Sequence, residues 1–338
     1  MCIELRDTSL MAVMAGLVTL TSVITVLMMP FAEAQGGGLQ KDFYSSTCPK
    51  AEKIVRSAVE KYFANDSTIA PGLLRLHFHD CFVQGCDGSV LISGSSAERT
   101  AFANLGLRGF EVIDDAKSQL EATCPGIVSC ADILALAARD AVDLSDGPRW
   151  TVALGRRDGR VSSASDVANL PSPLDSVTDQ RKKFADKGLS DKDLVTLVGA
   201  HTIGQTDCAF FRYRLYNFTA TGNADPSVSQ ASLSKFRDLC PEDGDPSVRV
   251  ALDQGSAGKF DAQFFRNIKE GNGVLESDQR LWEDEATKGT VAKYAGNLRG
   301  LIGLRFDYEF SKAMNKLGAV GVKTGTDGEI RKTCSQFN

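Results

Sequence analysis

The stretch Arg75-Leu-His-Phe-His-Asp-Cys-Phe-Val-Gln-Gly-Cys-Asp-Gly-Ser89 contains two of the three histidines in this 338-residue chain. The third, His201, lies far downstream in Val198-Gly-Ala-His-Thr-Ile-Gly204. Chemistry that depends on imidazole groups therefore has few candidate residues. The fold must bring the two stretches together if both serve one site.

Residues 68–82 have the pattern of a helix, and residues four apart on a helix share a face. Arg75 and His79 therefore project from one side, with Phe78 one turn from Arg75. His77 is turned away from His79, so a two-histidine metal clamp does not fit this segment. An arginine and a histidine four residues apart on a helix, taken alone, are usually packed into the protein core without a catalytic role. We predict a structural role for His77.

The turn after this helix is rich in hard oxygen donors and is bracketed by Cys81 and Cys86. Such a turn suits Ca²⁺, although its spacing is not that of an EF-hand. A solvated loop and a zinc site at the two cysteines are the alternatives, and zinc lacks a second ligand pair. The candidate calcium donors are the carboxylates of Asp80 and Asp87, the hydroxyl of Ser89 and the carbonyls of Val83 and Gly85.

Helical periodicity dominates the rest of the chain, and it predicts an all-α protein of ten or more helices. Trp150 to Leu154 is the only segment whose alternation favours a strand. The clearest helical segments are 51–63, 130–139, 190–198, 260–268 and 301–317. Loops rich in Gly and Pro are expected at 93–96, 145–150, 169–174, 243–246 and 253–258.

The N-terminal segment resembles a secretion signal. An apolar run from Leu10 to Met29 ends at Pro30, and Ala32-Glu-Ala34 offers small residues for a signal peptidase. We predict cleavage after Ala34, which leaves a mature chain of residues 35–338. An uncleaved membrane anchor is the alternative, since about 20 apolar residues can span a bilayer.

Cysteine usage agrees with secretion. Of the nine cysteines, Cys2 lies in the signal, and the other eight imply four disulfides among 105 possible pairings. Two glycosylation sequons begin at Asn65 and Asn217. The net charge of the whole chain is only −5, and there is no basic tract, so nothing indicates nucleic-acid binding.

Residues 75–89 look like the distal motif of the plant secretory (class III) haem peroxidases, and residues 193–204 look like their proximal motif. The resemblance extends over the mature chain, from Phe43-Tyr-Ser-Ser-Thr-Cys-Pro49 to Gly328-Glu-Ile-Arg331 and Cys334. It implies the all-α haem peroxidase fold, with two helical halves and one haem b between them.

The resemblance also implies roles for individual residues. His201 would be the axial haem ligand, and Asp278 its hydrogen-bond partner, which makes the imidazole more electron-rich. His79 would act as base and then acid, and Asn104 would fix its tautomer. Arg75 would stabilise the transition state as a permanent cation. The substrate-binding residues would be Phe78, Pro171 and Phe210.

Two calcium sites and four disulfides follow from the same resemblance. The distal calcium would add Glu98, through water, to the donors named above. The proximal calcium would use Thr202, Asp253, Ser256, the carbonyl of Lys259 and Asp261. This chain lacks the family's usual proline in the proximal loop and carries a lysine there, so we predict a more labile proximal calcium. The implied disulfides are Cys48–Cys124, Cys81–Cys86, Cys130–Cys334 and Cys208–Cys240.

The implied activity is that of a donor:hydrogen-peroxide oxidoreductase, which reduces hydrogen peroxide to water through a ferryl intermediate while phenolic donors lose single electrons. We expect a secreted monomer of the apoplast or cell wall, with no membrane contact after signal cleavage. A vacuolar location is less favoured because no long C-terminal extension follows Cys334. Lignification, suberisation, auxin oxidation and defence all stay open.

Two alternatives belong to other classes. A catalytically silent cell-wall protein could keep the fold for binding alone, but it would have no reason to retain the full set of candidate catalytic residues. A non-haem metalloenzyme would need converging histidines. The positions of His77, His79 and His201 provide too few ligands on one face.

Overall fold

The structure is a computed structural model that describes residues 38–220, 222–296 and 301–338. The predicted signal, residues 1–34, lies outside the described residues. The described part of the chain is mostly helical, which confirms the expectation of an all-α fold with ten or more helices.

The helices agree closely with the predicted segments where the helical periodicity of the sequence extends over many residues. The segment expected at 301–317 has those bounds, and the segment expected at 68–82 is shifted by one residue. The α-helices are α2 (Ala51–Asn65), α3 (Ile69–Val83), α4 (Phe110–Thr123), α5 (Cys130–Leu144), α6 (Val177–Asp186), α7 (Asp191–Val198), α8 (Tyr213–Tyr216), α9 (Gln230–Leu239), α10 (Gln263–Lys269), α11 (Glu276–Glu283), α12 (Glu285–Ala295) and α13 (Leu301–Leu317). Short 3₁₀ helices are η1 (Ser89–Leu91), η2 (Glu98–Thr100), η3 (Phe102–Asn104), η4 (Ala164–Asn169), η5 (Gly199–Thr202) and η6 (Cys208–Phe210).

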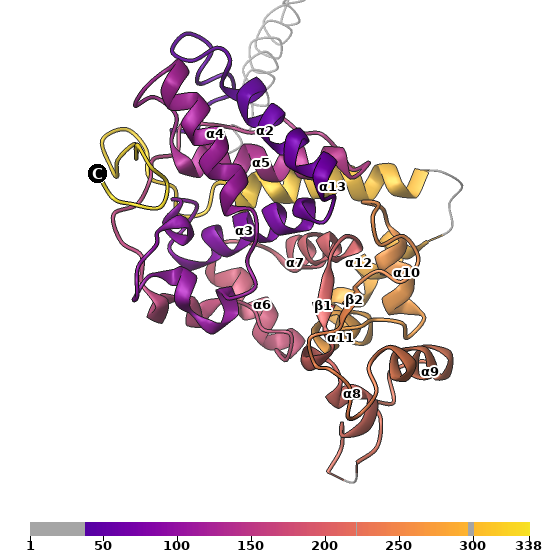
Figure 1. Cartoon of the computed structure of the whole chain (residues 1–338). Coiled ribbons are helices and arrows are strands. Elements are labelled where there is room, and N and C mark those ends of the chain that lie inside the picture. Colours follow the sequence, from indigo (N-terminus) through magenta and orange to yellow (C-terminus); the bar gives the residue numbers. More distant parts are fainter. Residues whose placement is uncertain (1–37, 221, 297–300) are drawn as a thin grey trace, which may run out of the picture. The chain divides into compact units, whose positions relative to one another are not determined.

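The helices pack in two groups. In the first, α2, α3, α4 and α5 contact one another, and in the second, α7, α10, α11, α12 and α13 do so, with α6 against α7 and α11. Figure 1 shows α2 to α5 gathered together, with α10, α11 and α12 away from them on the right. The distal motif lies on α3 in the first group, and His201 directly follows α7 in the second.

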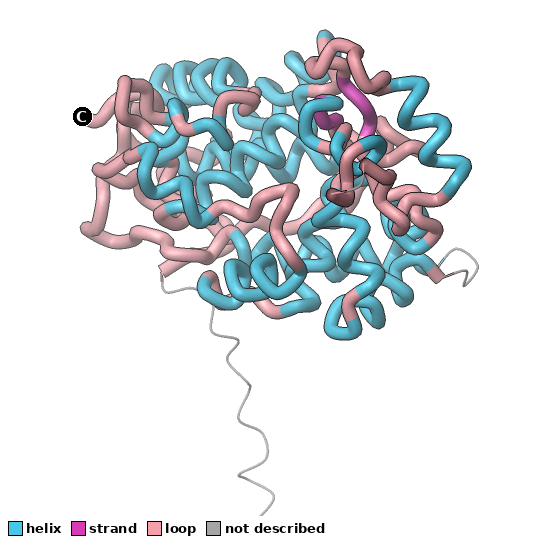
Figure 2. Tube along the Cα trace, turned by 90° about the horizontal axis from the view of Figure 1, so that it is seen from below, coloured by secondary structure: helices cyan, strands magenta, loops and turns pink. Residues whose placement is uncertain are grey.

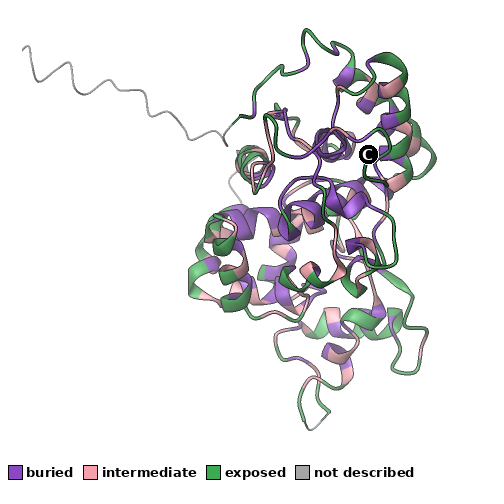
Figure 3. Ribbon diagram, turned by 90° about the vertical axis from the view of Figure 1, so that its left-hand side faces the viewer, coloured by how far each residue is buried: buried purple, intermediate pink, exposed green. Residues whose placement is uncertain are grey.

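Helix α5 lies at the centre of its group, as its burial shows. Every residue of α5 from Cys130 to Val142 is buried, and Ser129 caps the helix by accepting a hydrogen bond from the Asp132 amide at 3.1 Å. Such a helix has no solvent face, unlike α2, whose buried residues form one stripe. Figure 3 shows this contrast as purple helices inside and green helix faces outside.

The expected strand at Trp150 to Leu154 is wrong. Leu154 makes only an isolated bridge with Gln40, and the other residues of the segment are in no regular element. The strands lie instead at β1 (Gln205–Asp207) and β2 (Arg249–Ala251), which pair antiparallel (Figure 2). Three residues are too few to show alternation in sequence, so only the tertiary pairing defines this ribbon.

Four disulfides close the described part of the chain, and they are the pairs that the resemblance implies: Cys48–Cys124, Cys81–Cys86, Cys130–Cys334 and Cys208–Cys240. The Cys130–Cys334 disulfide links the start of α5 to the C-terminal segment. All eight cysteines among the described residues are therefore in disulfides, and none of these eight is free to bind zinc. No helix in the described ranges is long and apolar enough to cross a membrane.

Candidate active site

The distal side of the site lies on α3. The Arg75 Nε donates a hydrogen bond to the His79 Nε2 at 3.2 Å, and an Arg75 terminal nitrogen donates to the Ala103 carbonyl at 3.0 Å. The spacing of four residues on one helical face produces the first contact. The second contact is tertiary and could not be read from the sequence.

Asn104 fixes the orientation of the distal imidazole. Its Nδ2 donates to the Glu98 carbonyl at 2.8 Å, which leaves its Oδ1 2.7 Å from the His79 Nδ1. An amide oxygen only accepts, so we infer that the His79 Nδ1 carries the proton. The His79 Nε2 is then a lone-pair acceptor that faces Arg75.

The proximal side follows α7. A capping box formed by Ser190 and Asp193 begins that helix, and the chain then tightens into η5, which carries His201. The His201 Nδ1 lies 2.9 and 3.1 Å from the two carboxylate oxygens of Asp278, in the first turn of α11. The His201 Nε2 is the ring nitrogen left to bind a metal.

The two imidazoles have opposite electrostatic settings. Burial, with a smaller contribution from the Arg75 charge, lowers the pKa of His79 to about 3. Burial also lowers the pKa of His201, but the Asp278 carboxylate outweighs it and leaves that pKa above its ordinary value. His79 is therefore neutral near pH 7, whereas the Asp278 carboxylate makes the His201 imidazole more electron-rich.

Two of these groups are surrounded by protein but still reach solvent. Burial lowers the pKa of the Arg75 guanidinium, yet the residue keeps an exposed surface. The His201 side chain is 37 % exposed, whereas its partner Asp278 is 3 % exposed. The Arg75 charge also acts on His201 and opposes the rise in its pKa.

Aromatic rings lie near both histidines. The Phe264 ring lies edge-on to His201 at 6.1 Å, and it was not predicted, because nothing in its sequence context distinguishes it from a core phenylalanine. Phe78 stacks on Phe82 at 4.5 Å. Of the other candidate substrate residues, Pro171 is half-buried and Phe210 is 39 % exposed.

His77 is turned into the core, as the helical geometry predicts. It is buried, and its ring lies 3.7 Å from the Cys81 sulfur. Burial lowers its pKa to about 3, with a smaller contribution from Arg156. A buried, neutral imidazole packed against a disulfide has no access to the site.

The candidate distal calcium donors converge on the turn after α3. Asp80 accepts from the Gly88 amide at 2.9 Å, and Asp87 accepts from the Ser89 amide at 3.1 Å. Asp80, Asp87, Ser89 and Glu98 are all buried. Gly85 has φ +103 and lies so close to the Gly321 carbonyl that a side chain there would clash, which explains why the turn needs glycine.

Three buried oxygen atoms near this turn have no hydrogen-bond partner in the described part of the chain. The Ser89 hydroxyl and both Glu98 carboxylate oxygens are buried without a hydrogen-bond partner among the described residues. Burial raises the pKa of Glu98 to about 8, and burial with the neighbouring Asp87 raises the pKa of Asp80. Buried oxygens of this kind are costly unless a cation binds them, so the donor set fits Ca²⁺.

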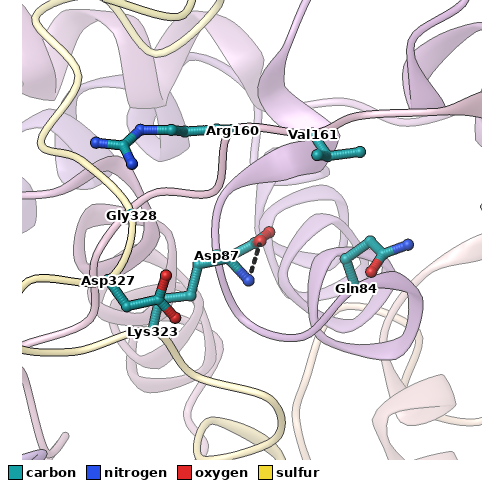
Figure 4. A pocket seen from close by; sticks show the side chains of 7 residues that line it. All are labelled: Gln84, Asp87, Arg160, Val161, Lys323, Asp327 and Gly328. Carbon is teal, nitrogen blue, oxygen red and sulfur yellow. Dashed lines mark ion pairs between the residues drawn. The ribbon is translucent and has the colours of Figure 1, made fainter.

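The C-terminal segment holds the distal turn in place. The fully buried Arg331 donates to the carbonyls of Gly88 at 2.8 Å and Asp87 at 3.2 Å, and Lys323 forms an ion pair with Asp87 at 3.3 Å. Figure 4 shows this pair at a pocket of about 210 Å³. The pocket is lined by Gln84, Asp87, Arg160, Val161, Lys323, Asp327 and Gly328.

The candidate proximal donors also converge. The Thr202 hydroxyl lies 3.1 Å from Asp253, 3.4 Å from the Lys259 carbonyl and 3.5 Å from Asp261. The Ser256 hydroxyl lies 3.0 Å from Asp261 and 3.3 Å from Asp253. Unlike the distal turn, this loop is partly at the surface, where Lys259 is exposed.

Neither donor set is a cluster of three metal-binding side chains. No three His, Cys, Asp or Glu residues group in this way anywhere in the described ranges. Each candidate site instead combines carboxylates with hydroxyl and carbonyl oxygens, a mixture that suits calcium and not zinc. The sequon residues Asn65 and Asn217 are exposed.

Comparisons with known proteins identify the family. The peroxidase family matches residues 55–297. The chain is 63 % identical over 328 residues to Peroxidase 25 of Arabidopsis thaliana, which covers 97 % of this chain and 100 % of the relative. It is 56 % identical over 316 residues to Peroxidase N1 of Nicotiana tabacum, which covers 94 % and 96 %. The chain therefore belongs to the class III plant peroxidases and is a peroxidase enzyme.

Proposed function

We propose that the chain is a secreted haem peroxidase that reduces hydrogen peroxide to water and oxidises phenolic donors in one-electron steps, in the cell wall. The observation that carries this proposal is the pairing of two imidazoles with opposite partners, His79 with an amide and His201 with a carboxylate. One haem b, bound by the His201 Nε2, supplies the redox chemistry when present.

The distal residues move the proton. His79 is neutral over the physiological range, so its Nε2 takes a proton from one peroxide oxygen and returns it to the other, which leaves as water. Arg75 remains a cation despite its burial and stabilises the negative charge on the departing oxygen. Asn104 keeps the imidazole in the tautomer that these transfers need.

The remaining candidate residues support this chemistry. Asp278 holds the proximal ring and increases its basicity. Phenolic donors dock near Phe78, Pro171 and Phe210. Two calcium ions, one at the turn after α3 and one next to His201, hold the ends of the segments that carry the two histidines. Residues 35–338 form the mature, monomeric peroxidase domain.

Absorption spectroscopy of the purified protein tests the proposal. We expect a Soret band and oxidation of guaiacol that requires peroxide. A colourless protein, or a coloured protein inactive towards guaiacol, would contradict it. N-terminal analysis of the secreted protein tests processing, with Gln35 expected as the first residue and an intact Met1 as the contrary result.

A further inference from the structure

The C-terminal segment places a lysine on one of the proposed distal calcium donors. The Lys323 Nζ lies 3.3 Å from the Asp87 Oδ2, and the Asp87 Oδ1 accepts a hydrogen bond from the Ser89 amide at 3.1 Å. The Asp87 side chain is 2 % exposed, whereas the Lys323 side chain is 27 % exposed. The ammonium group therefore reaches a buried carboxylate from the pocket that both residues line (Figure 4).

Backbone contacts fix the position of this lysine. The Lys323 carbonyl accepts a hydrogen bond from the Arg157 amide at 2.8 Å, in an isolated antiparallel bridge. Gly328 lies so close to the lysine that a Cβ on it would meet the Lys323 Cδ at 3.3 Å. The aliphatic stem of the lysine therefore packs against the backbone while its charged end extends to Asp87.

Lys323 differs from the other cation beside this turn. Arg331 directs its terminal nitrogens to the backbone carbonyls of Gly88 and Asp87, so it leaves the donor carboxylates unpaired. In the described part of the chain, Lys323 alone forms an ion pair with a carboxylate among the proposed distal donors. The lysine and a calcium ion are therefore attracted by the same carboxylate.

We propose that Lys323 weakens the distal calcium site, because its ammonium group competes with the ion for the charge of Asp87. The inference rests on the proposed function, which places a calcium ion at the turn after α3. Calcium binds a carboxylate oxygen at about 2.4 Å, so an ion on Asp87 and an ammonium group 3.3 Å from the same carboxylate lie within several ångströms of each other. Two cations at that separation repel each other.

Removing the lysine charge should tighten calcium binding. Coulomb's law for charges of +2 and +1 about 6 Å apart in water corresponds to about a tenfold change in the dissociation constant, so we expect Lys323→Gln to hold the distal calcium about tenfold more tightly. Lys323→Arg keeps the charge and should behave like the wild type. Metal analysis of the haem-loaded enzyme, equilibrated with increasing EGTA after mild chelation has removed the proximal ion, measures the retention of the remaining calcium.

Thermal unfolding gives a second readout, which separates competition from a simple bracing role. In excess EGTA, Lys323→Gln should melt at a lower temperature than the wild type, because the buried Asp87 carboxylate has lost its partner. The rise in melting temperature on adding calcium should be larger in the variant, since tighter binding to the folded state stabilises it more. A lysine that only braced the C-terminal segment would lower both melting temperatures equally and leave that rise unchanged.

A lysine on another part of the chain provides a matched control. Lys183, in α6, forms an ion pair with Asp175 at 2.6 Å, and its side chain is 26 % exposed, close to the value for Lys323. Neither residue belongs to a proposed calcium donor set. Lys183→Gln therefore removes a comparable ion pair and should leave both calcium retention and the calcium-dependent rise in melting temperature unchanged.

Each contrary result has a defined meaning. Equal or weaker calcium retention in Lys323→Gln would overturn the inference, and so would an equal gain in Lys323→Arg or in Lys183→Gln. A wild-type enzyme that holds no calcium would overturn the proposed calcium site and the inference with it. The Soret band and the peroxide-dependent oxidation of guaiacol test the proposed peroxidase function independently of these measurements.

Discussion

The distal and proximal histidines are the same residue in opposite settings. His79 meets the neutral Asn104 amide and the Arg75 cation, and its pKa falls to about 3. His201 meets the Asp278 carboxylate, and its pKa rises despite burial. Both rings are surrounded by protein, so burial alone cannot explain the difference. The different partners of the two Nδ1 atoms account for the opposite pKa shifts, and this difference supports the proposed roles of His79 as base and His201 as ligand.

Removing the proximal ring should have the largest effect. His201→Ala deletes the proposed axial ligand of the haem iron, so we expect loss of haem or a changed ligation and no measurable turnover. The ratio of Soret to protein absorbance checks this. Normal haem content with an unchanged spectrum would show that His201 is not the ligand.

Removing the distal ring should leave haem in place. In His79→Leu the proximal pair is untouched, but the proton acceptor is gone, and the reaction with peroxide should slow by about 10²–10⁴-fold or more. Stopped-flow spectroscopy of the peroxide reaction measures this rate. Equal haem loss in this variant and in His201→Ala would abolish the proposed division of roles.

Asp278→Asn should have an intermediate effect, because it keeps the shape of the proximal partner but removes its charge. The His201 ring becomes less electron-rich, so the haem reduction potential should rise and activity should fall by about 10–100-fold. A redox titration measures the potential. An unchanged potential would mean that the carboxylate only orients the ring.

A single substitution can give the distal histidine the same kind of partner as the proximal one, a carboxylate in place of an amide. In the wild type the pKa of His79 is about 3, so His79 stays neutral and the peroxide reaction should fall off only as pH approaches 3. Asn104→Asp places a carboxylate on the ring and raises this pKa, because the anion stabilises the protonated form. The acid limb of the rate profile should move to higher pH by about one unit or more. An unmoved limb would assign it to another group.

The smallest expected effect concerns the two calcium sites. The distal donors are buried and tied to the C-terminal segment by Arg331, whereas the proximal loop has exposed residues such as Lys259 and no proline. Mild chelation should therefore remove the proximal calcium first and leave one ion per chain. Metal analysis that still finds two ions would contradict this difference.

Local sequence predicted those features that depend on neighbouring residues. The long periodic helices, the shared face of Arg75 and His79 and the opposite orientation of His77 follow from helical geometry alone. Local sequence did not predict the short elements. The expected strand at Trp150 to Leu154 is wrong, and the strands β1 and β2 were not predicted, because three residues are too few to show a periodic pattern.

The sequence by itself determined the helical class, the helix that carries the distal residues and, through the family motifs, which residues to examine. The tertiary structure decided which groups meet. Asn104 reaches His79 across 25 residues, and Asp278 reaches His201 across 77. The opposite pKa shifts of the two rings arise from those contacts. Electrostatic interactions depend on distance through space, which spacing along the chain does not encode.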